Sequence, residues 1–278
     1  MANISVSKKG IKSLKGIEYF HNLEVLICSD NQLTKLDISK NHQLATLYCY
    51  NNQLTTLDLS KYAPLVNLYC SNNQLTTLDV SKQGLLKKLS CFNNQLTELD
   101  VSKNTELKEL FCKTNQLTTL DVSQNTALTY LRCDSNRITV LDVSKNTAMT
   151  ELWCSDNRLT TLDVSKNTVL KRLWCSNNQL TKLNVSKSNT ALKELYCDKN
   201  LIKDEGMDTL VASLPTSSNG KMYVIYYENE QNVMTKTQVA AAKANGWIPH
   251  SAYLALLWVH WKEYEGASNG KKRRKASK

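Results

Sequence analysis

Nine cysteines recur along the chain at a nearly fixed spacing, and this spacing constrains the fold more than any other feature. An asparagine lies three residues after each cysteine, and the full pattern reads LxxLxCxxNxLTxLDVSxNxx. A fixed period indicates a stack of similar coils rather than a set of unlike elements. The spacing is 21 residues seven times and 22 once, at Cys28, Cys49, Cys70, Cys91, Cys112, Cys133, Cys154, Cys175 and Cys197.

The first part of each repeat, LxxLxC, alternates apolar and variable residues as a short β-strand does. A period of 21 residues is too short for a crossover through a full helix, so each coil must return by turns and extended chain. Strands of successive coils then form a parallel sheet, about 4.8 Å apart. The inward columns predict one continuous core, and they run from Leu23 to Leu192, Leu26 to Leu195, Leu33 to Ile202, Leu36 to Leu183 and Ile38 to Val185.

The pattern resembles the leucine-rich repeat family, whose LxxLxLxxN/CxL signature has a leucine where this chain has cysteine. The resemblance covers residues 23–202 and is similar to the short 21-residue bacterial type of internalin-like and Bacteroidetes surface or secreted proteins. It implies an α/β-type repeat in a right-handed solenoid, with a curved parallel β-sheet on the concave face. Turns with extended or 3-10 segments would form the convex face.

Both ends depart from the repeat. Residues 1–22 fit a degenerate first repeat that shields the open N-terminal end of the stack. Residues 203–265 are expected to form an α/β cap, because a bare last coil would expose its core and an unpaired strand edge. Within the cap we expect a helix over 204–215, a strand over 221–227 and a helix capped by Thr235, whereas 247–266 is left open between strand and helix. Such caps resemble those of some Bacteroidetes proteins.

Charge is concentrated at the C-terminal end. The net charge is +10, and the last eight residues, KKRRKASK, carry six positive charges. Residues 266–278 are therefore predicted to form a basic, disordered tail. The first residues, MANISVSKKG, have no apolar signal segment, which indicates an intracellular protein or a signal that was removed. The family resemblance instead implies a secreted or cell-surface location, and no apolar run is long enough for a membrane span.

The repeated polar residues have structural explanations. The cysteines are expected to be reduced core residues, since an odd number at one repeat position matches neither a disulfide framework nor a zinc module. The asparagine column is expected to bond the backbone of its own turn and of the next coil. Each aspartate of LDVS is expected to bond the serine two residues later. We therefore predict no metal, no cofactor and no catalytic site.

Functional information should lie where the repeats differ, at the strand positions that point outward. The residue before each cysteine is aromatic in six of nine copies. Exposed aromatic residues usually mark an interaction surface, although neighbouring rings can also stack only for stability. The candidate ligand-binding residues on the concave face are Tyr48, Tyr50, Tyr69, Phe92, Phe111, Tyr130, Arg132, Glu151, Trp153, Arg172, Trp174 and Tyr196.

These features predict a non-catalytic, monomeric recognition module that binds a protein partner. Glycan binding is the first alternative, because aromatic rings stack on sugars. A second alternative is a nucleic acid or an anionic surface, bound by the lysine column of the SK positions and the basic tail. A scaffold without a ligand of its own is the third.

Overall fold

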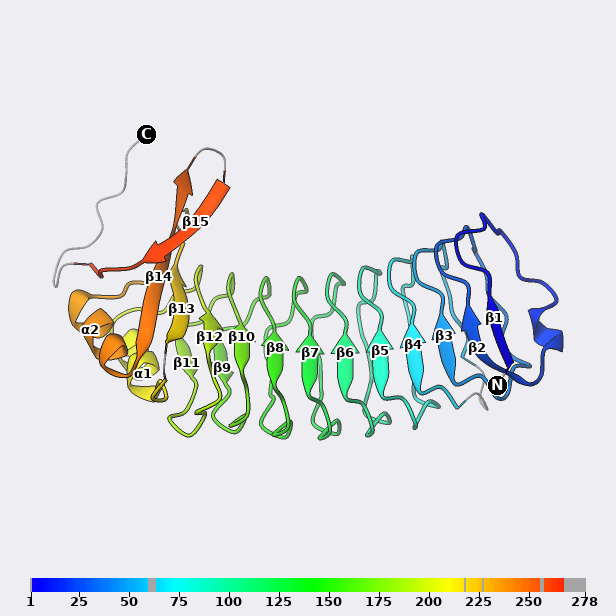
Figure 1. Ribbon diagram of the computed structural model, residues 1–278, viewed down its shortest axis with the longest axis horizontal. Coiled ribbons are helices and arrows are strands. Elements are labelled where there is room, and N and C mark those ends of the chain that lie inside the picture. The colour runs from blue at the N-terminus through cyan, green and yellow to red at the C-terminus, as the bar shows by residue number, and fades with distance from the viewer. Residues whose placement is uncertain (1, 60–63, 218, 227, 256–257, 268–278) are drawn as a thin grey trace. The chain divides into compact units, whose positions relative to one another are not determined.

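The computed structural model describes residues 2–59, 64–217, 219–226, 228–255 and 258–267, with the backbone alone for 253–255 and 258–259. The chain forms two compact units, Met1–Met149 and Thr150–Lys278, called unit 1 and unit 2 below. Figure 1 shows the elements of both.

Unit 1 is a run of coils that each contribute one short strand to a parallel sheet (Figure 1). Neighbouring strands from β2 onward pair with an offset of one repeat, so that Leu26 lies beside Leu47 and Leu47 beside Leu68. A 3-10 helix, η1 (Ile17–Tyr19), lies between the first two strands. The strands are β1 (Ala2–Ser5), β2 (Leu23–Ile27), β3 (Thr46–Tyr48), β4 (Asn67–Tyr69), β5 (Lys88–Ser90), β6 (Glu109–Phe111) and β7 (Tyr130–Arg132).

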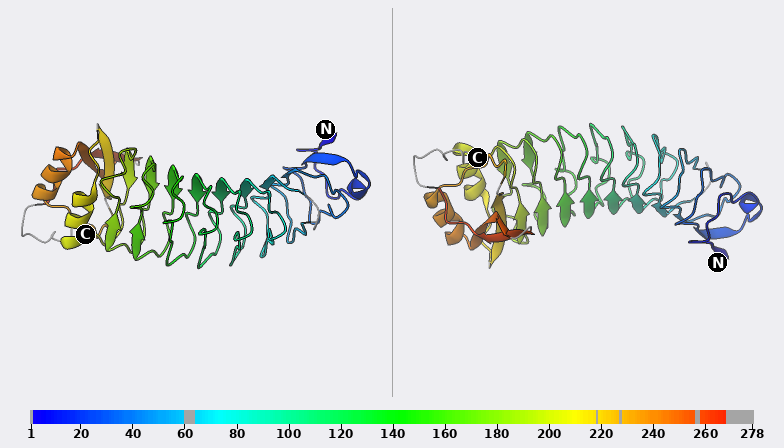
Figure 2. Two further views of the ribbon diagram at one scale, coloured as in Figure 1. Left: turned by 90° about the horizontal axis from the view of Figure 1, so that it is seen from below. Right: turned by 90° about the horizontal axis from the view of Figure 1, so that it is seen from above.

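Unit 2 continues the same repeat and adds two helices and longer strands. The parallel strands β8 (Glu151–Trp153), β10 (Arg172–Trp174), β12 (Glu194–Tyr196), β13 (Gly220–Ile225) and β14 (Trp247–Ala255) pair in this order. Strand β15 (Trp258–Glu263) pairs antiparallel with β14. Across the coil, β9 (Thr161–Asp163) and β11 (Lys182–Asn184) form a second small sheet, which Figure 2 shows from two sides.

The predicted helices of the cap are confirmed. Helix α1 (Glu205–Ser213) packs against β11 and against α2 (Lys236–Ala244), which also contacts β14. Thr235 caps α2 as expected: its side chain accepts a bond from the Gln238 N–H at 3.3 Å, while Gln238 Oε1 accepts from the Thr235 N–H at 2.8 Å. This reciprocal pair satisfies two backbone donors that a helix start leaves open.

The end of the cap is where sequence and structure differ. The segment left open over 247–266 forms the hairpin of β14 and β15. Ala267, predicted to lie in a disordered tail, instead bridges to Thr235, and its N–H donates to the Met234 carbonyl at 2.9 Å. The tail prediction is therefore wrong at its first residues, and its remainder, 268–278, lies outside the described residues.

Leucine and cysteine point inward and their strand neighbours point outward, as predicted. In β3, for example, Leu47 and the following Cys49 are fully buried, whereas Thr46 and Tyr48 are half-buried. All nine cysteines are free and buried, which confirms the prediction of reduced core thiols. Burial of each leucine contributes about 1.5–3 kcal/mol relative to exposure, so the stacked columns are the main stabilising term.

The asparagine column forms a ladder of side-chain to backbone hydrogen bonds. Asn73 is typical: its Nδ2 donates to the carbonyls of Cys70 and Cys49 at 3.0 and 3.1 Å, and its Oδ1 accepts from the Leu54 N–H at 3.0 Å. The prediction named the next coil as partner, and this was wrong, because both inter-coil partners belong to the preceding coil. The same pattern holds for Asn52, Asn94, Asn115, Asn136, Asn178 and Asn200.

A second buried amide column lies on the other side of the coil, and the sequence analysis did not single it out. Asn125 is fully buried, and its Nδ2 donates to the carbonyls of Val101 and Asn104 in the preceding coil at 2.9 and 2.8 Å. In the sequence, this column is the second asparagine of the pattern LxxLxCxxNxLTxLDVSxNxx. Asn41, Asn104 and Asn146 donate to the preceding coil in the same way, whereas the sequence has Tyr62 and Gln83 at this position in two coils. Coils that carry both asparagines are thus fixed to their predecessor by amide side chains at two places.

The chain turns sharply after each strand through a left-handed residue, two positions after the cysteine. The positions have φ between 53 and 57° and are occupied by Asp30, Asn51, Asn72, Asn93, Thr114, Ser135, Asp156, Asn177 and Lys199. Asparagine and aspartate tolerate this conformation because their short side chains bond locally. Thr114, Ser135 and Lys199 are the exceptions, and of these Thr114 is strained most because its side chain is β-branched.

Replacement of Asn73 by alanine should lower the free energy of unfolding by about 1–3 kcal/mol, because the Leu54 N–H loses its acceptor and the Cys49 and Cys70 carbonyls each lose one of two amide donors. Urea unfolding followed by circular dichroism measures this change. The matched control is Gln74→Ala, which alters an exposed neighbour. Equal midpoints for the two variants would contradict a stabilising role for the ladder.

Replacement of Thr114 by asparagine should raise the free energy of unfolding by about 1 kcal/mol, because asparagine adopts the left-handed conformation with less strain. Thr118→Asn, at an exposed position outside that conformation, is the control. A destabilised Thr114→Asn variant would contradict this prediction, because it would show that contacts of the threonine side chain outweigh the backbone strain.

The cysteines should not react with a thiol reagent at pH 8 in the native protein and should react fully in guanidinium chloride. Burial raises the pKa of Cys91 to about 12, so the thiol keeps its proton. Because the folded pKa lies above the unfolded one, this contribution to stability is complete below pH 9 and is lost as the pH rises toward 12. Rapid reaction in the native state, measured with Ellman's reagent, would contradict this assignment.

Candidate functional site

The outward side chains of the parallel strands form a surface that we call the strand face. In unit 2 it carries a continuous stack of rings. Trp153 and Trp174 stack with centroids 3.7 Å apart and planes at 19°, and Tyr196 follows Trp174 at 5.4 Å. Tyr223 stacks on Tyr196 at 4.1 Å. The structure therefore brings three predicted site residues together in register and extends them with a fourth ring.

The stack continues into the cap through rings that sequence reasoning missed. His250 stacks on Tyr223 at 5.0 Å, and Trp261 meets Tyr223 edge-on at 4.9 Å. The pairing register explains this, because Tyr223 occupies the position of Tyr196 one strand on, and His250 the position after that. The signal lay in KMYV at 221–224, which repeats the pattern of ELYC at 194–197 with valine in place of cysteine.

Stacking decides which part of each ring a ligand can reach. The rings lie face to face along the direction in which the strands follow one another, so Trp174 has Trp153 on one face and Tyr196 on the other. The half-buried rings therefore present their edges to solvent. Burial, the hydrogen bond with Tyr223 and the charge of Glu194 together raise the pKa of Tyr196, which keeps its hydroxyl protonated.

A ladder of charges runs beside the stack. Arg172 Nη1 lies 3.0 Å from Glu151 Oε1, and Arg172 Nε lies 3.5 Å from Glu194 Oε2. Trp153 Nε1 donates to Glu151 Oε2 at 3.3 Å, so the ladder also fixes the indole. Predicted residues Glu151, Arg172 and Trp153 thus form one connected surface of aromatic edges and fixed charges.

On the other side of the stack lie two largely buried carboxylates. Ser176 Oγ donates to Asp198 Oδ1 at 2.5 Å, and burial raises the pKa of Asp198. Glu230 of the cap accepts from the N–H groups of Lys199 and Tyr226 at 2.9 and 2.6 Å, and burial raises its pKa as well. The bonds of Glu230 to backbone donors join the cap to the last coil, and Asp198 bonds a side chain of the preceding coil, so both carboxylates have a structural role.

The cap also completes the asparagine ladder. Asn232 Nδ2 donates to the carbonyls of Cys197 and Val224 at 2.8 and 3.0 Å, and its Oδ1 accepts from the Ile202 N–H at 2.8 Å. In the coils the asparagine follows the cysteine by three residues, whereas here it follows Val224 by eight. The cap therefore reproduces the bonds of a coil without its sequence spacing.

Unit 1 carries shorter groups of rings on its strand face. Tyr48 and Tyr69 stack at 4.5 Å with planes 2° apart, and Phe111 lies 5.1 Å from Tyr130. The column is interrupted at Ser90. Of the remaining predicted residues, Tyr50 and Phe92 line a small pocket together with Tyr69, and Arg132 forms an ion pair with Asp134 at 2.9 Å.

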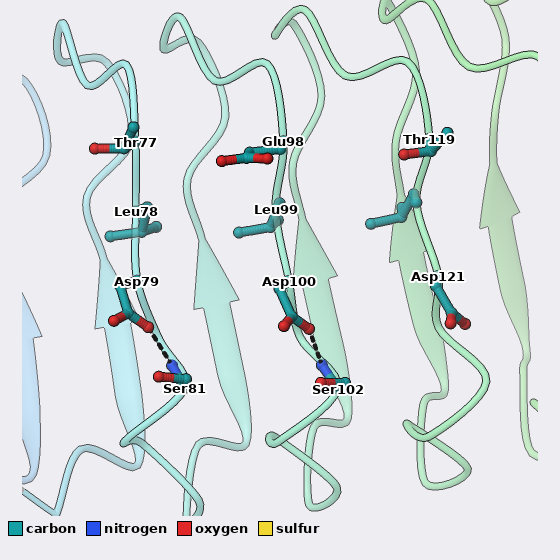
Figure 3. Close-up of a pocket in the computed structure, with 11 residues that line it drawn as sticks. Thr77, Leu78, Asp79, Ser81, Glu98, Leu99, Asp100, Ser102, Thr119 and Asp121 are labelled. Atoms are coloured by element: carbon teal, nitrogen blue, oxygen red, sulfur yellow. Dashed lines mark hydrogen bonds between the residues drawn. The ribbon is translucent and has the colours of Figure 1, made fainter.

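A larger, shallow hollow lies on the turn side of unit 1, away from the strands (Figure 3). Its lining repeats from coil to coil, with Asp79, Asp100 and Asp121 in one row. Asp79 Oδ1 and Asp100 Oδ1 each accept from the serine N–H two residues on, at 2.8 Å, which confirms the predicted turn bond. Because each aspartate serves its own turn, the row has no asymmetry suited to a reaction.

The described residues contain no group of three or more His, Cys, Asp or Glu side chains placed to hold a metal ion. No helix in the described part of the chain is long and apolar enough to cross a membrane.

Comparisons with known proteins agree with this geometry. A family model described as "Leucine Rich repeats (2 copies)" matches residues 21–62. The functional domain of InlJ from Listeria monocytogenes, described as including a cysteine ladder, is 38% identical with a TM-score of 0.73, and the match covers 84% of this chain and 52% of that domain. No curated protein matches the chain.

Two further solved structures are similar. A leucine-rich repeat protein of Leptospira interrogans is 26% identical with a TM-score of 0.59, over 73% of this chain and 61% of that one. The internalin InlF of Listeria monocytogenes shares the fold at 19% identity and a TM-score of 0.60, over 92% of this chain and 87% of that one. The chain spans less than two thirds of the InlJ domain and of the Leptospira protein.

The stacked 21-residue coils, their cysteine and asparagine columns and these similarities lead to one conclusion. The chain is a leucine-rich repeat protein, and its repeats form a parallel-sheet solenoid of the internalin-like type.

Proposed function

We propose that the chain is a non-catalytic recognition module that binds a protein partner through the ring stack of unit 2 and the charges beside it. Leucine-rich repeat solenoids are typically protein-interaction modules. The observation that supports this assignment is the combination of half-buried aromatic edges with an ordered ladder of Glu151, Arg172 and Glu194. Large rings with fixed neighbours bury much area at little entropic cost, as binding hot spots do.

If the rings stack only for stability, their faces are in contact with one another but their solvent-facing edges have no role. Trp153 and Trp174 remain half-buried, so part of each indole is open to a partner. Both roles are compatible, because a stack that is already ordered loses little further freedom when a partner binds.

Glycan binding has less support on this stack. Recognition of a sugar by an aromatic residue uses the open face of a ring, and both faces of Trp174 and Tyr196 are occupied by their neighbours. The edges offer fewer contacts to the C–H groups of a pyranose.

Polyanion binding by the lysine column also has less support. Lys82, Lys103 and Lys145 are exposed, but each follows an aspartate by three residues in the same turn. The hydrogen bonds from the serine of that turn lower the pKa of the carboxyl group, and the charge of the lysine lowers it further. The stripe is therefore a row of opposite charges with little net field.

Simultaneous replacement of Trp153 and Trp174 by alanine should weaken binding to a protein partner at least 100-fold, since central aromatic anchors each contribute about 2 kcal/mol or more. The partner is first identified by capture on the wild-type chain, and its dissociation constant is then measured for both chains. Thermal unfolding must show that the variant still folds.

The control is Val140→Ala with Val169→Ala, which removes exposed apolar side chains elsewhere. Unchanged affinity of the tryptophan variant would contradict the proposal and would show that the ring stack only stabilises the fold. Binding to a glycan array that survives in the control but not in the tryptophan variant would instead favour sugars.

A further inference from the structure

A small pocket opens on the strand face of unit 1 where the aromatic column is interrupted at Ser90. Its volume is about 290 Å³. Rings of Tyr50, Tyr69 and Phe92 form its walls, Ser71 and Ser90 form its floor, and Asn51 and Asn72 lie at its rim. We call the three rings and two serines the ring slot.

The slot has the width of one ring. Tyr50, Ser71 and Phe92 occupy the same position in three successive coils, so the two rings are separated by two coil spacings, about 9–10 Å. A planar group over Ser71 would then stack on both at the spacing seen elsewhere on the sheet. Ser71 thus leaves a gap between two rings.

Open ring faces converge on this gap. One face of Tyr69 is covered by Tyr48, and the other turns toward the coil of Ser90. Lys113 Nζ lies 5.3 Å from the centroid of Phe92, on the side of the following coil, so the free face of Phe92 turns toward the coil of Ser71. In contrast to the stack of unit 2, the slot offers faces rather than edges.

The floor provides one hydrogen-bond donor. Ser71 Oγ and Ser90 Oγ lie 2.8 Å apart, and the two residues are 2% and 7% exposed. One hydroxyl donates to the other, which leaves a single O–H for an occupant. The residues that line the slot carry no charge, and the rim amides already bond one another, with Asn72 Nδ2 2.7 Å from Asn51 Oδ1.

We propose that the ring slot binds the side chain of a tyrosine from the protein partner, with its phenol oxygen accepting a bond from the Ser71 and Ser90 pair. This assignment rests on the proposed function, because it names one contact of that recognition. Phenylalanine or leucine would fill the volume but leave the donor unpaired. A pyranose would bring several hydroxyl groups to a floor that provides a single hydrogen-bond donor. None of the described residues that line the slot is a carboxylate that could accept bonds from those hydroxyls.

The probe for this proposal is p-cresol, the side-chain analogue of tyrosine, titrated into the full chain and followed by amide shifts in ¹H–¹⁵N NMR spectra. The amides of Ser71 and Ser90 should shift with a dissociation constant on the order of 1 mM, as expected for a ligand of this size. Toluene should bind about tenfold more weakly, because it lacks the acceptor. Methyl α-glucopyranoside should cause no shift at these positions.

Two variants test the geometry. Ser90→Tyr supplies the ring that most other coils carry at this position and should abolish p-cresol binding. Ser155→Tyr, which adds a ring to the strand face of unit 2, should leave it unchanged. Simultaneous replacement Ser71→Ala and Ser90→Ala removes both hydroxyls and should remove the difference between p-cresol and toluene, so the proposal stays testable even if Ser90→Tyr folds poorly.

Absence of shifts at the slot, persistence of binding in a folded Ser90→Tyr variant, or preference for the sugar would each overturn the proposal. The test is independent of the ring stack in unit 2. Failure here leaves the effect of the tryptophan replacements unaltered, and loss of that effect would not change direct binding of p-cresol to the slot.

Discussion

The interaction on which the rest of the structure depends is the buried amide ladder. A coil of 21 residues must bend several times, and each bend leaves backbone groups without a partner in its own strand. Asn73 and its equivalents satisfy carbonyls of two coils and one N–H with a single side chain. The leucine and cysteine columns supply most of the hydrophobic stabilisation, but the amide ladder fixes where each coil turns and how it meets its predecessor.

Much of the fold could be predicted because the period specifies it. The inward direction of Leu47 and Cys49, and the outward direction of Tyr48, follow from strand alternation. The partner of each asparagine could not be assigned, since an amide between two coils can bond either neighbour, and only the three-dimensional path of the coil selects the preceding one. The hairpin of β14 and β15 lay in an apolar segment without a helical or alternating period, so its type stayed open.

The candidate surface was predictable in direction but not in extent. Trp153 and Trp174 were found because the position before cysteine varies while its neighbours do not. Tyr223 and His250 were missed because the cap no longer carries the cysteine and asparagine that mark the register. In the sequence Ser90 appears only as an interruption of the aromatic column, and Ser71 only as one of several serines after cysteine. Their proposed role depends on which ring faces are open around them, and the sequence does not give this.

Asn232 of the cap bonds two backbone groups of the final coil, the Cys197 carbonyl and the Ile202 N–H, as Asn200 bonds the Cys175 carbonyl and the Leu180 N–H of the coil before it. Asn232 reaches these groups from a loop of different length than in the coils. The contact involves only the final coil, so it does not depend on how many coils precede it. A gene that gains or loses one 63-nucleotide repeat would thus keep a matching end. The length of the recognition surface can change in whole-coil steps during evolution, while the terminus that protects it from aggregation stays the same.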